Sequence, residues 1–154
     1  MTNPDLGWQT LAFAELDTDQ LYQIMRLRQL VFIVEQDCVY VDLDGLDQDS
    51  VHLCVWRDHE LLAYLRCLPP GLDYSESALG RIVVSQQARG LKLGRELVSR
   101  GITFNLQTWP GSGIRIGAQT YLEKFYQDLG FETVSDSYME DGIAHINMLL
   151  RTQK

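Results

Sequence analysis

A short basic segment with two glycines, Arg89-Gly90-Leu91-Lys92-Leu93-Gly94-Arg95, lies between an expected strand and an expected helix. A helix N-terminus presents unpaired backbone N–H groups and a partial positive charge, and both favour phosphate binding. Glycine lets a backbone approach a ligand closely, and Arg89, Lys92 and Arg95 add positive charge. The segment has neither the GxxxxGK(S/T) spacing of a Walker loop nor the GxGxxG spacing of a nicotinamide-cofactor site. It therefore indicates a phosphate-binding loop of another kind, and the alternative is a helix start that binds nothing.

The most acidic part of the chain runs from Glu35 to Asp49, with six acidic residues and no basic one. A calcium loop would place Gly45 at its sixth position, but Tyr40 and Val51 would then stand at the first and twelfth positions, where carboxylates are needed. We therefore expect no calcium site. Two interpretations stay open: a rim that attracts a cationic acceptor, or loop charge that is simply solvated.

Hydrophobic periodicity and turn residues predict a mixed α/β order of elements. Strand, helix and strand follow one another around the basic segment, which is typical of a right-handed crossover between parallel strands. The expected helices are Thr18–Gln36, capped by Thr18, then Leu93–Thr108 and Thr120–Leu129, which Gly130 ends. The expected strands are Trp8–Phe13, Val51–Arg57, Leu61–Leu68, Leu79–Ser85, Ile114–Ala118, Phe131–Tyr138 and Ala144–Leu150. Together they make a mixed sheet of about seven strands with helices on its faces.

The whole chain has 154 residues, with 13 Lys and Arg against 21 Asp and Glu, and a formal net charge of −8. This length and composition predict one domain spanning residues 1–154. The acidic balance argues against nucleic acid as a partner. The N-terminal MTNPDLGW is no signal peptide, and no apolar run is long enough to span a membrane. The three cysteines show no CxxC spacing, so we expect a reducing, cytoplasmic location and no zinc or other metal site.

These features resemble the GNAT superfamily of N-acetyltransferases. Its acyl-CoA loop reads (R/Q)-x-x-G-x-(G/A), which Arg89 and Gly94 match, while Lys92 stands where glycine is usual. GRIVVS resembles the fourth strand of that fold, and AQTYLEKFYQDLGF resembles its N-x-x-A-x-x-L-Y-x-x-x-G-F helix, with Gln119 in place of Asn. A narrower resemblance, carried by LRQLVFIVEQDC, LPPG, GRIVVS, RGLKLG, GAQ, FYQDLGF and EDGIAHINM, is to the ElaA-like branch of the superfamily.

The resemblance implies a GNAT fold, with a splayed parallel pair of strands and about four helices, that uses acetyl-CoA as co-substrate without a metal. It also implies where the cofactor binds. The pyrophosphate would rest on backbone N–H groups of the basic loop, and the pantetheine would pair with the free edge of the fourth strand. The expected cofactor-binding residues are Ile82, Val83, Val84, Arg89, Gly90, Leu91, Lys92, Leu93, Gly94, Arg95, Gln119 and Tyr126.

The reaction implied is direct attack of an acceptor amine on the thioester. Tyr126 stands where the superfamily places the general acid for the departing thiolate, although its apolar helical face also fits a core aromatic. The candidate general bases are His145, His52 and Glu35, since histidine titrates in the useful range and burial beside Phe32 would raise the pKa of Glu35. Each has a simpler interpretation, either as a hydrogen-bonded structural histidine or as a carboxylate in an ion pair. Arg28 lies two helical turns from Glu35, about 10 Å along the axis, and would not be that partner.

The acceptor is not identified by the sequence beyond a small-molecule or peptide amine, with Arg28, Phe32 and Glu35 as expected contacts. The stretch from Arg28 to Asp47 also resembles the early R, F, E and D pattern of acyl-homoserine-lactone synthases, which gives a related alternative. A third alternative, from a different class, is a non-catalytic acyl-CoA-binding regulatory module. It would be stabilised by acetyl-CoA without releasing thiol.

Overall fold

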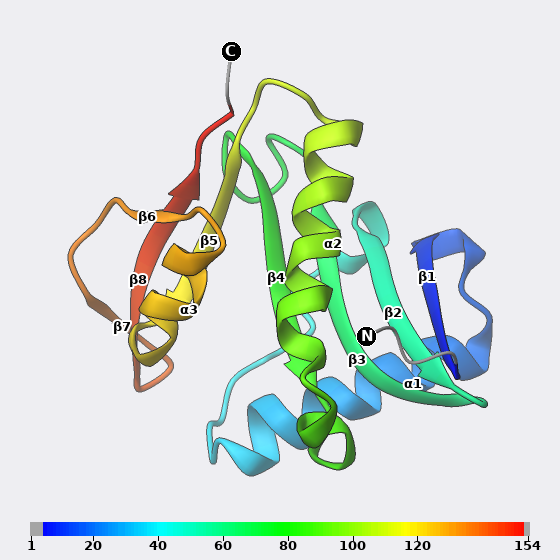
Figure 1. Cartoon of the computed structure of the whole chain (residues 1–154). Helices are drawn as coiled ribbons and strands as arrows, with labels where there is room; N and C mark the ends of the chain where they lie inside the picture. Colours follow the sequence, from blue (N-terminus) through cyan, green and yellow to red (C-terminus); the bar gives the residue numbers. More distant parts are fainter. Residues whose placement is uncertain (1–4, 153–154) are drawn as a thin grey trace.

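The computed structural model describes residues 5–152 and centres on a mixed eight-stranded sheet in the order β1-β2-β3-β4-β5-β8-β6, with β7 also paired to β8 (Figure 1). The strands are β1 (Leu6–Ala12), β2 (Val51–Arg57), β3 (Glu60–Leu68), β4 (Ser77–Val84), β5 (Ile114–Gln119), β6 (Glu132–Thr133), β7 (Tyr138–Glu140) and β8 (Ile143–Leu150). The helices are α1 (Thr18–Arg28), α2 (Leu93–Thr108) and α3 (Glu123–Asp128), with a π-helix at Gln29–Glu35 and short 3-10 turns elsewhere. The mixed α/β architecture predicted from the sequence is confirmed, with eight strands rather than about seven.

The extra strand comes from the end of the chain. The sequence predicted one strand at Phe131–Tyr138, but the segment forms two short strands, β6 and β7, which both pair with β8. The helix predicted at Thr120–Leu129 is also shorter, because a 3-10 turn precedes α3. Gly130 follows at φ +106, a backbone conformation that suits glycine and ends the helix as expected.

The first helix has a different cap from the one predicted, and its last turns have a different form. Asp17, not Thr18, is the N-cap: its carboxylate accepts a hydrogen bond from Gln20 N at 2.7 Å, and the Gln20 side chain accepts one from Asp17 N. The helical path continues to Glu35 as a π-helix, in which Gln36 N donates to Val31 O, five residues back. The extent was therefore predicted well, but the widened last turns were not.

Helices cover both faces of the sheet (Figure 1). On one face, α2 and α3 bury the larger apolar cluster, and Gly101 lets α2 approach closely, since a Cβ there would lie 3.0 Å from Leu65 Cδ2. On the other face, α1 packs Ile24 and Leu27 against Tyr64 of β3. The part of the chain that the structure describes contains no helix long and apolar enough to cross a membrane.

The parallel strands β4 and β5 pair only at their beginnings, through Ser77↔Ile114 and Ala78↔Arg115. Beyond these pairs they diverge, as Figure 1 shows. A buried side chain of α2 holds the paired end together: Asn105 Nδ2 donates to Ser77 Oγ at 3.1 Å and to Ala78 O at 3.0 Å. The splayed parallel pair expected from the sequence is therefore present, and beyond it no strand in the described part of the chain pairs with the facing edges of β4 and β5.

Candidate active site

The basic segment forms the end of a 3-10 helix (Gln86–Leu91), which follows β4, and the first turn of α2. Lys92 is the N-cap of α2 and has φ 57 and ψ 40, the left-handed conformation that a glycine would adopt without strain. Within residues 5–152, no side chain caps this end of the helix, and a Cβ at Gly90 or Gly94 would meet no atom within 4 Å. The loop backbone is therefore accessible, and Lys92 reproduces the shape expected of glycine at that position.

Arg89 is held by a residue that is distant in sequence. Its Nη2 donates to Glu35 Oε1 at 2.9 Å, and Gln86 Nε2 donates to the same oxygen at 3.0 Å. Arg89 lowers the pKa of the Glu35 carboxyl, mainly through this hydrogen bond. The expectation that burial raises that pKa is corrected, because Glu35 is exposed and ion-paired at the surface.

The end of β4 contains a break in its pairing with β3. The register shifts between Tyr64 and Arg66, and opposite this shift Arg81 takes a φ of 51. After it, Val83 and Val84 pair with β3 on one side, while their other edge faces the divergence from β5. Ile82, Val83 and Val84, the residues expected to contact pantetheine, thus lie on a strand edge with no partner strand among the described residues.

The acidic segment is neither a free rim nor simply solvated, because three of its aspartates form ion pairs with three arginines. Arg28 contacts Asp42 at 2.8 Å and Asp47 at 2.7 Å. Arg66 and Arg81 join the same cluster from β3 and β4. We call this the ionic cluster, and its members are Arg28, Arg66, Arg81, Asp42, Asp44 and Asp47. It connects the helix, the sheet and the segment after the π-helix.

Two predicted site residues are buried, one as a member of this cluster and the other in contact with it. Arg28 has no exposed surface, and its guanidinium contacts Asp42 and Asp47. The expectation that Arg28 contacts an acceptor is therefore corrected. His52 is also fully buried, with Nδ1 2.6 Å from Tyr64 Oη and Nε2 2.9 Å from Asp47 O, and burial lowers its pKa. His52 is therefore a hydrogen-bonded structural histidine. Phe32 is half-buried and packs against the apolar cluster under α1.

Tyr126 lies in α3 on the opposite face, with Phe125 and Phe131 edge-on to its ring at 5.1 and 5.9 Å. Its residue surface is 5% exposed, and burial raises the pKa of its hydroxyl. No described residue forms a hydrogen bond with that hydroxyl. Tyr126 is thus both a core aromatic and the carrier of an unpartnered, protonated hydroxyl. Gln119 stands nearby in sequence, half-buried at the end of β5.

His145 is half-buried on β8, with Nδ1 2.7 Å from Ile143 O. Because a carbonyl only accepts, Nδ1 must carry the proton, which leaves Nε2 with a free lone pair in the neutral ring. Nε2 lies 3.8 Å from Glu140 Oε2, and the ring stacks on Tyr138 at a centroid distance of 6.0 Å. Of the candidate bases, His145 alone presents a lone pair that no strong hydrogen bond occupies in the described part of the chain.

Two tyrosines that the sequence did not single out, Tyr74 and Tyr138, converge on β5. A Cβ built on Gly117 would lie 3.2 Å from Tyr138 Oη and 3.6 Å from Tyr74 Oη. Tyr138 lies directly opposite His145 in the β7–β8 pair. Counting back from His145 across the turn could therefore have identified it from the sequence. Tyr74 precedes β4 in a loop, where no periodicity marks its direction.

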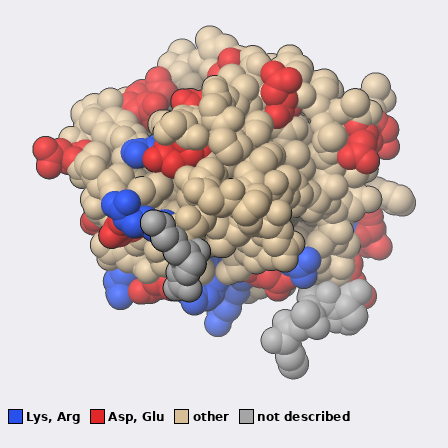
Figure 2. Space-filling model, turned by 90° about the horizontal axis from the view of Figure 1, so that it is seen from above, with Lys and Arg blue, Asp and Glu red and all other residues tan. Residues whose placement is uncertain are grey.

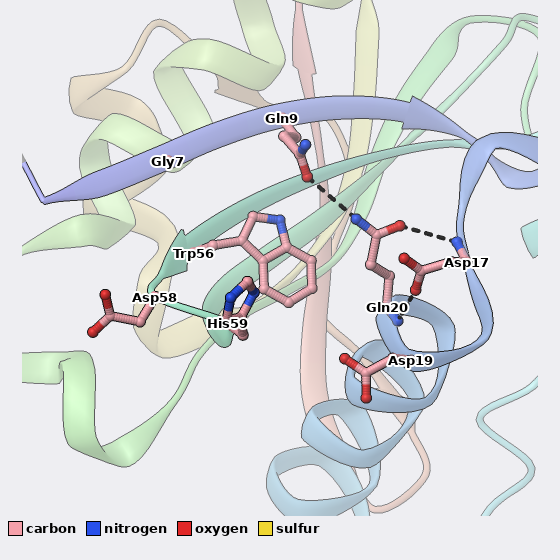
Figure 3. A pocket seen from close by; sticks show the side chains of 8 residues that line it. All are labelled: Gly7, Gln9, Asp17, Asp19, Gln20, Trp56, Asp58 and His59. Atoms are coloured by element: carbon pink, nitrogen blue, oxygen red, sulfur yellow. Dashed lines mark hydrogen bonds between the residues drawn. The ribbon is translucent and has the colours of Figure 1, made fainter.

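Two surface hollows lie apart from these residues. One, of about 320 Å³, is lined by Trp56, His59 and the start of α1, with Asp17, Asp19 and Asp58 at its border (Figure 3). Another, of about 380 Å³, lies between β1 and α2 beside Trp8 and Phe104. Neither is lined by a predicted site residue. Within residues 5–152, no group of three or more His, Cys, Asp or Glu side chains is arranged to hold a metal ion.

The charged surface agrees with the net charge of the chain. Seen from above, acidic side chains are scattered over the molecule, and basic ones gather toward one border (Figure 2). That face presents no broad basic area of the kind that a nucleic-acid duplex requires.

Comparison with known proteins connects this geometry to a family. A family model described as an acetyltransferase (GNAT) domain matches residues 15–152. Protein ElaA of Escherichia coli K12 is 43% identical over 145 residues, which cover 93% of this chain and 95% of ElaA. The crystal structure of E. coli ElaA matches with a TM-score of 0.87 and 41% identity, over 94% of this chain and 98% of that one.

Two further structures mark how far the likeness extends. An acyl-CoA N-acyltransferase from Pseudomonas aeruginosa is 40% identical, with a TM-score of 0.87 over 93% of this chain and 98% of that one. The AHL synthase LasI has a TM-score of 0.76 over 95% of this chain and 89% of its own, but only 15% identity. The likeness to LasI is therefore one of fold alone.

Proposed function

This chain belongs to the GNAT acetyltransferase family, and from that premise we propose that it transfers an acetyl group from acetyl-CoA to the primary amine of a small-molecule or peptide acceptor. The family and fold make it an N-acyltransferase that uses acyl-CoA. Two features carry the proposal: an α2 N-terminus that no described side chain caps, and a β4 edge that no described strand pairs with beyond Ala78.

The residues of the loop fit a phosphorylated cofactor. Backbone N–H groups at the start of α2 would hold the pyrophosphate, and Arg89, Lys92 and Arg95 are all exposed there. The loop residues Gly90, Leu91, Leu93 and Gly94 would supply the backbone approach, since the glycines have open space around them. Ile82, Val83 and Val84 would pair with the pantetheine as a neighbouring strand does, and Gln119 would border it from β5.

Acetyl-CoA, when bound, supplies a thioester whose C–S bond breaks as the new C–N bond forms. Holding the amine beside that carbon accounts for much of the expected rate. Backbone N–H groups at the interruption of β4 near Arg81 would stabilise the charge that develops on the thioester oxygen.

Two proton transfers accompany the exchange. His145 Nε2 would accept the proton that the ammonium of the acceptor must lose before attack, because its lone pair is free. Tyr126 would donate a proton to the departing thiolate, and its raised pKa keeps the hydroxyl protonated at neutral pH. Glu35 is left out of the base role because it is paired with Arg89, and His52 because it is fully buried. Phe32 remains an expected acceptor contact.

The acyl-homoserine-lactone alternative gains no specific support. Two members of the pattern on which it depends, Arg28 and Asp47, form a buried ion pair with each other. The likeness to LasI concerns the fold.

The direct test has two measurements. Acetyl-CoA at millimolar concentration should raise the melting temperature by mass action, whereas acetate at the same concentration should not. Release of free thiol should then depend on an added primary amine, tested with alkylamines, polyamines, amino acids and peptides. Absence of stabilisation would overturn the cofactor proposal. Stabilisation without amine-dependent thiol release would instead support the non-catalytic acyl-CoA-binding module.

A further inference from the structure

Two tyrosine hydroxyls, those of Tyr74 and Tyr138, lie over the backbone of β5 at Gly117, which has no side chain. Gly117 is exposed, although its neighbours Ile116 and Ala118 are buried in the core under α2 and α3. It therefore faces the opposite side of the sheet, the side that carries α1. A Cβ at this position would be 3.2 Å from Tyr138 Oη, tighter than ordinary contact, so glycine is what allows Tyr138 to approach the strand, while Tyr74 Oη lies at an ordinary 3.6 Å.

This surface lies at the splayed part of the sheet. Arg115 is the last residue of β5 that pairs with β4, and Gly117 comes two residues later. Continuing the same register places Gly117 level with Gly80, next to Arg81 at the interruption of β4. The tyrosine hydroxyls thus stand at the point where the two strands separate, which is where the proposed reaction would occur.

A carboxylate acts on both hydroxyls, because burial and, with it, the charge of Glu140 raise the pKa of Tyr74 and that of Tyr138. The pKa of Tyr74 is raised to about 12, chiefly by burial; the charges of Asp73 and Glu140 contribute to this rise, and that of Arg115 opposes it. Arg115 stands over the Tyr74 ring at 5.7 Å, but its guanidinium is engaged by Glu76 at 3.0 and 3.1 Å. Neither tyrosine hydroxyl has a hydrogen-bond partner among the described residues, so both oxygens are free to accept hydrogen bonds from a cation.

Nearby carboxylates favour the protonated form of a bound amine. The amine that attacks the thioester must be unprotonated, so a protonated amine held at this site is one that does not react. We propose that the acceptor carries a second cationic group, and that Tyr74 and Tyr138 bind this group above Gly117 while the other amine reaches the thioester. The substrate class is a diamine or polyamine. This inference rests on the acetyltransferase function proposed above.

The test compares 1,4-diaminobutane with 1-aminobutane, which has the same carbon chain and lacks the second charge. Thiol release from acetyl-CoA should show a kcat/KM at least about tenfold higher for the diamine, the size expected of hydrogen bonds to a charged group. Tyr74→Phe and Tyr138→Phe should each reduce that ratio, chiefly by raising the KM of the diamine. Gly117→Ala should do the same by displacing Tyr138. The control is Tyr22→Phe, which removes an exposed hydroxyl on α1 and should keep the ratio of the parent protein.

The outcomes separate the two proposals. Equal use of both amines, or an unchanged ratio in Tyr74→Phe and Tyr138→Phe, would overturn the cation subsite and leave amine acetylation standing. If neither amine releases thiol, the cation subsite is overturned, and the amino acids and peptides of the panel described above decide whether amine acetylation stands. The melting temperature and circular dichroism of every variant show whether a reduced ratio of kcat/KM values comes from unfolding. A raised KM for the diamine in a folded variant supports the subsite.

Discussion

Glu35 Oε1 accepts a hydrogen bond from Arg89 Nη2 at 2.9 Å, across 54 positions of the sequence. This contact joins the end of the π-helix to the loop that is proposed to bind the pyrophosphate. The first residue of the loop motif is therefore already engaged by a carboxylate, and a phosphate would have to compete for it.

The first prediction concerns this competition. Glu35→Gln removes the negative charge and should strengthen acetyl-CoA binding by about two- to fivefold, because an exposed ion pair contributes up to about 1 kcal/mol. Isothermal titration calorimetry measures the change. Glu96→Gln is the matched control, since Glu96 forms a similar surface pair with Arg100 on α2. Weaker binding in Glu35→Gln would mean that Glu35 orients Arg89 for the cofactor instead of competing with it.

The second prediction concerns the interruption of β4. Arg81 has φ 51, a strained conformation for a residue with a side chain, and ion pairs with Asp42 and Asp44 accompany it. Arg81→Ala and Arg81→Gly both lose these ion pairs, but only glycine adopts this φ freely. Arg81→Gly should therefore be more stable than Arg81→Ala by about 1 kcal/mol, as measured by urea unfolding. Equal stability would show that the backbone relaxes once the guanidinium is gone.

Local patterns predicted most of the fold, and the reason is visible in particular elements. The strand before Arg89, the helix after Lys92 and the strand at Ile114 each carry their own periodicity, so their order fixes the crossover. The path of the first helix was predicted for the same reason. The cap was missed by one residue because Asp17 and Thr18 are both good caps.

The site was predicted less completely, because its contacts join distant parts of the chain. Arg28 and Asp47 are 19 positions apart, and no periodicity connects them. The partner of Glu35 could not be found by helical spacing, since it lies on another element. Tyr74 is in a loop, and its approach to Gly117 depends on how the loop folds over β5. Sequence types indicated which chemistry is available, and tertiary structure decided which groups are free to perform it.

The third prediction is the dependence of stability on the ionic cluster and on pH. Asp47 is 5% exposed and contacts Arg28 at 2.7 Å and Arg66 at 3.0 Å. Asp47→Asn should lower the free energy of unfolding by about 3 kcal/mol, because each of the two buried guanidinium groups loses one of its two carboxylate partners. Asp128→Asn, at an exposed pair with Lys124, should change it by less than about 1 kcal/mol.

The pH dependence follows from the same cluster. Burial alone would raise the pKa values of Asp44 and Asp47. The hydrogen bonds and charges of the arginines outweigh it and lower both pKa values below their usual range. A lowered pKa in the folded state gives stability that is fully present above the unfolded pKa, about 3.9, and is lost as the pH falls toward the folded pKa. Urea unfolding from pH 7 to pH 3 should therefore show a loss of stability below about pH 4 that is smaller in Asp47→Asn. An equally steep loss in both proteins would assign acid unfolding to other groups.

The fourth prediction tests the proposed acid. Tyr126→Phe should lower kcat by roughly ten- to a thousandfold, in keeping with the usual size of general-acid effects, while the KM for acetyl-CoA changes little. Stability should be nearly unchanged, since no described residue bonds to the hydroxyl that is removed. Steady-state kinetics measure the effect. The control is Tyr121→Phe, because Tyr121 is 76% exposed on the preceding turn. Full turnover in a folded Tyr126→Phe would leave Tyr126 as a core aromatic only.

The fifth prediction compares two glycines of α2 that look alike in sequence. A Cβ at Gly101 would lie 3.0 Å from Leu65 Cδ2 and 3.1 Å from Leu79 Cδ2, and both leucines are buried in the core. Gly101→Ala should therefore lower the free energy of unfolding by about 1–3 kcal/mol, since overpacking outweighs the gain in helix propensity. A Cβ at Gly94 would meet nothing within 4 Å, so Gly94→Ala should raise stability by about 0.5–1 kcal/mol. The same variant should weaken acetyl-CoA binding if the Gly94 backbone approaches the pyrophosphate. Urea unfolding and calorimetry on the two proteins separate these effects, and a stabilising Gly101→Ala would show that α2 can move away from the sheet.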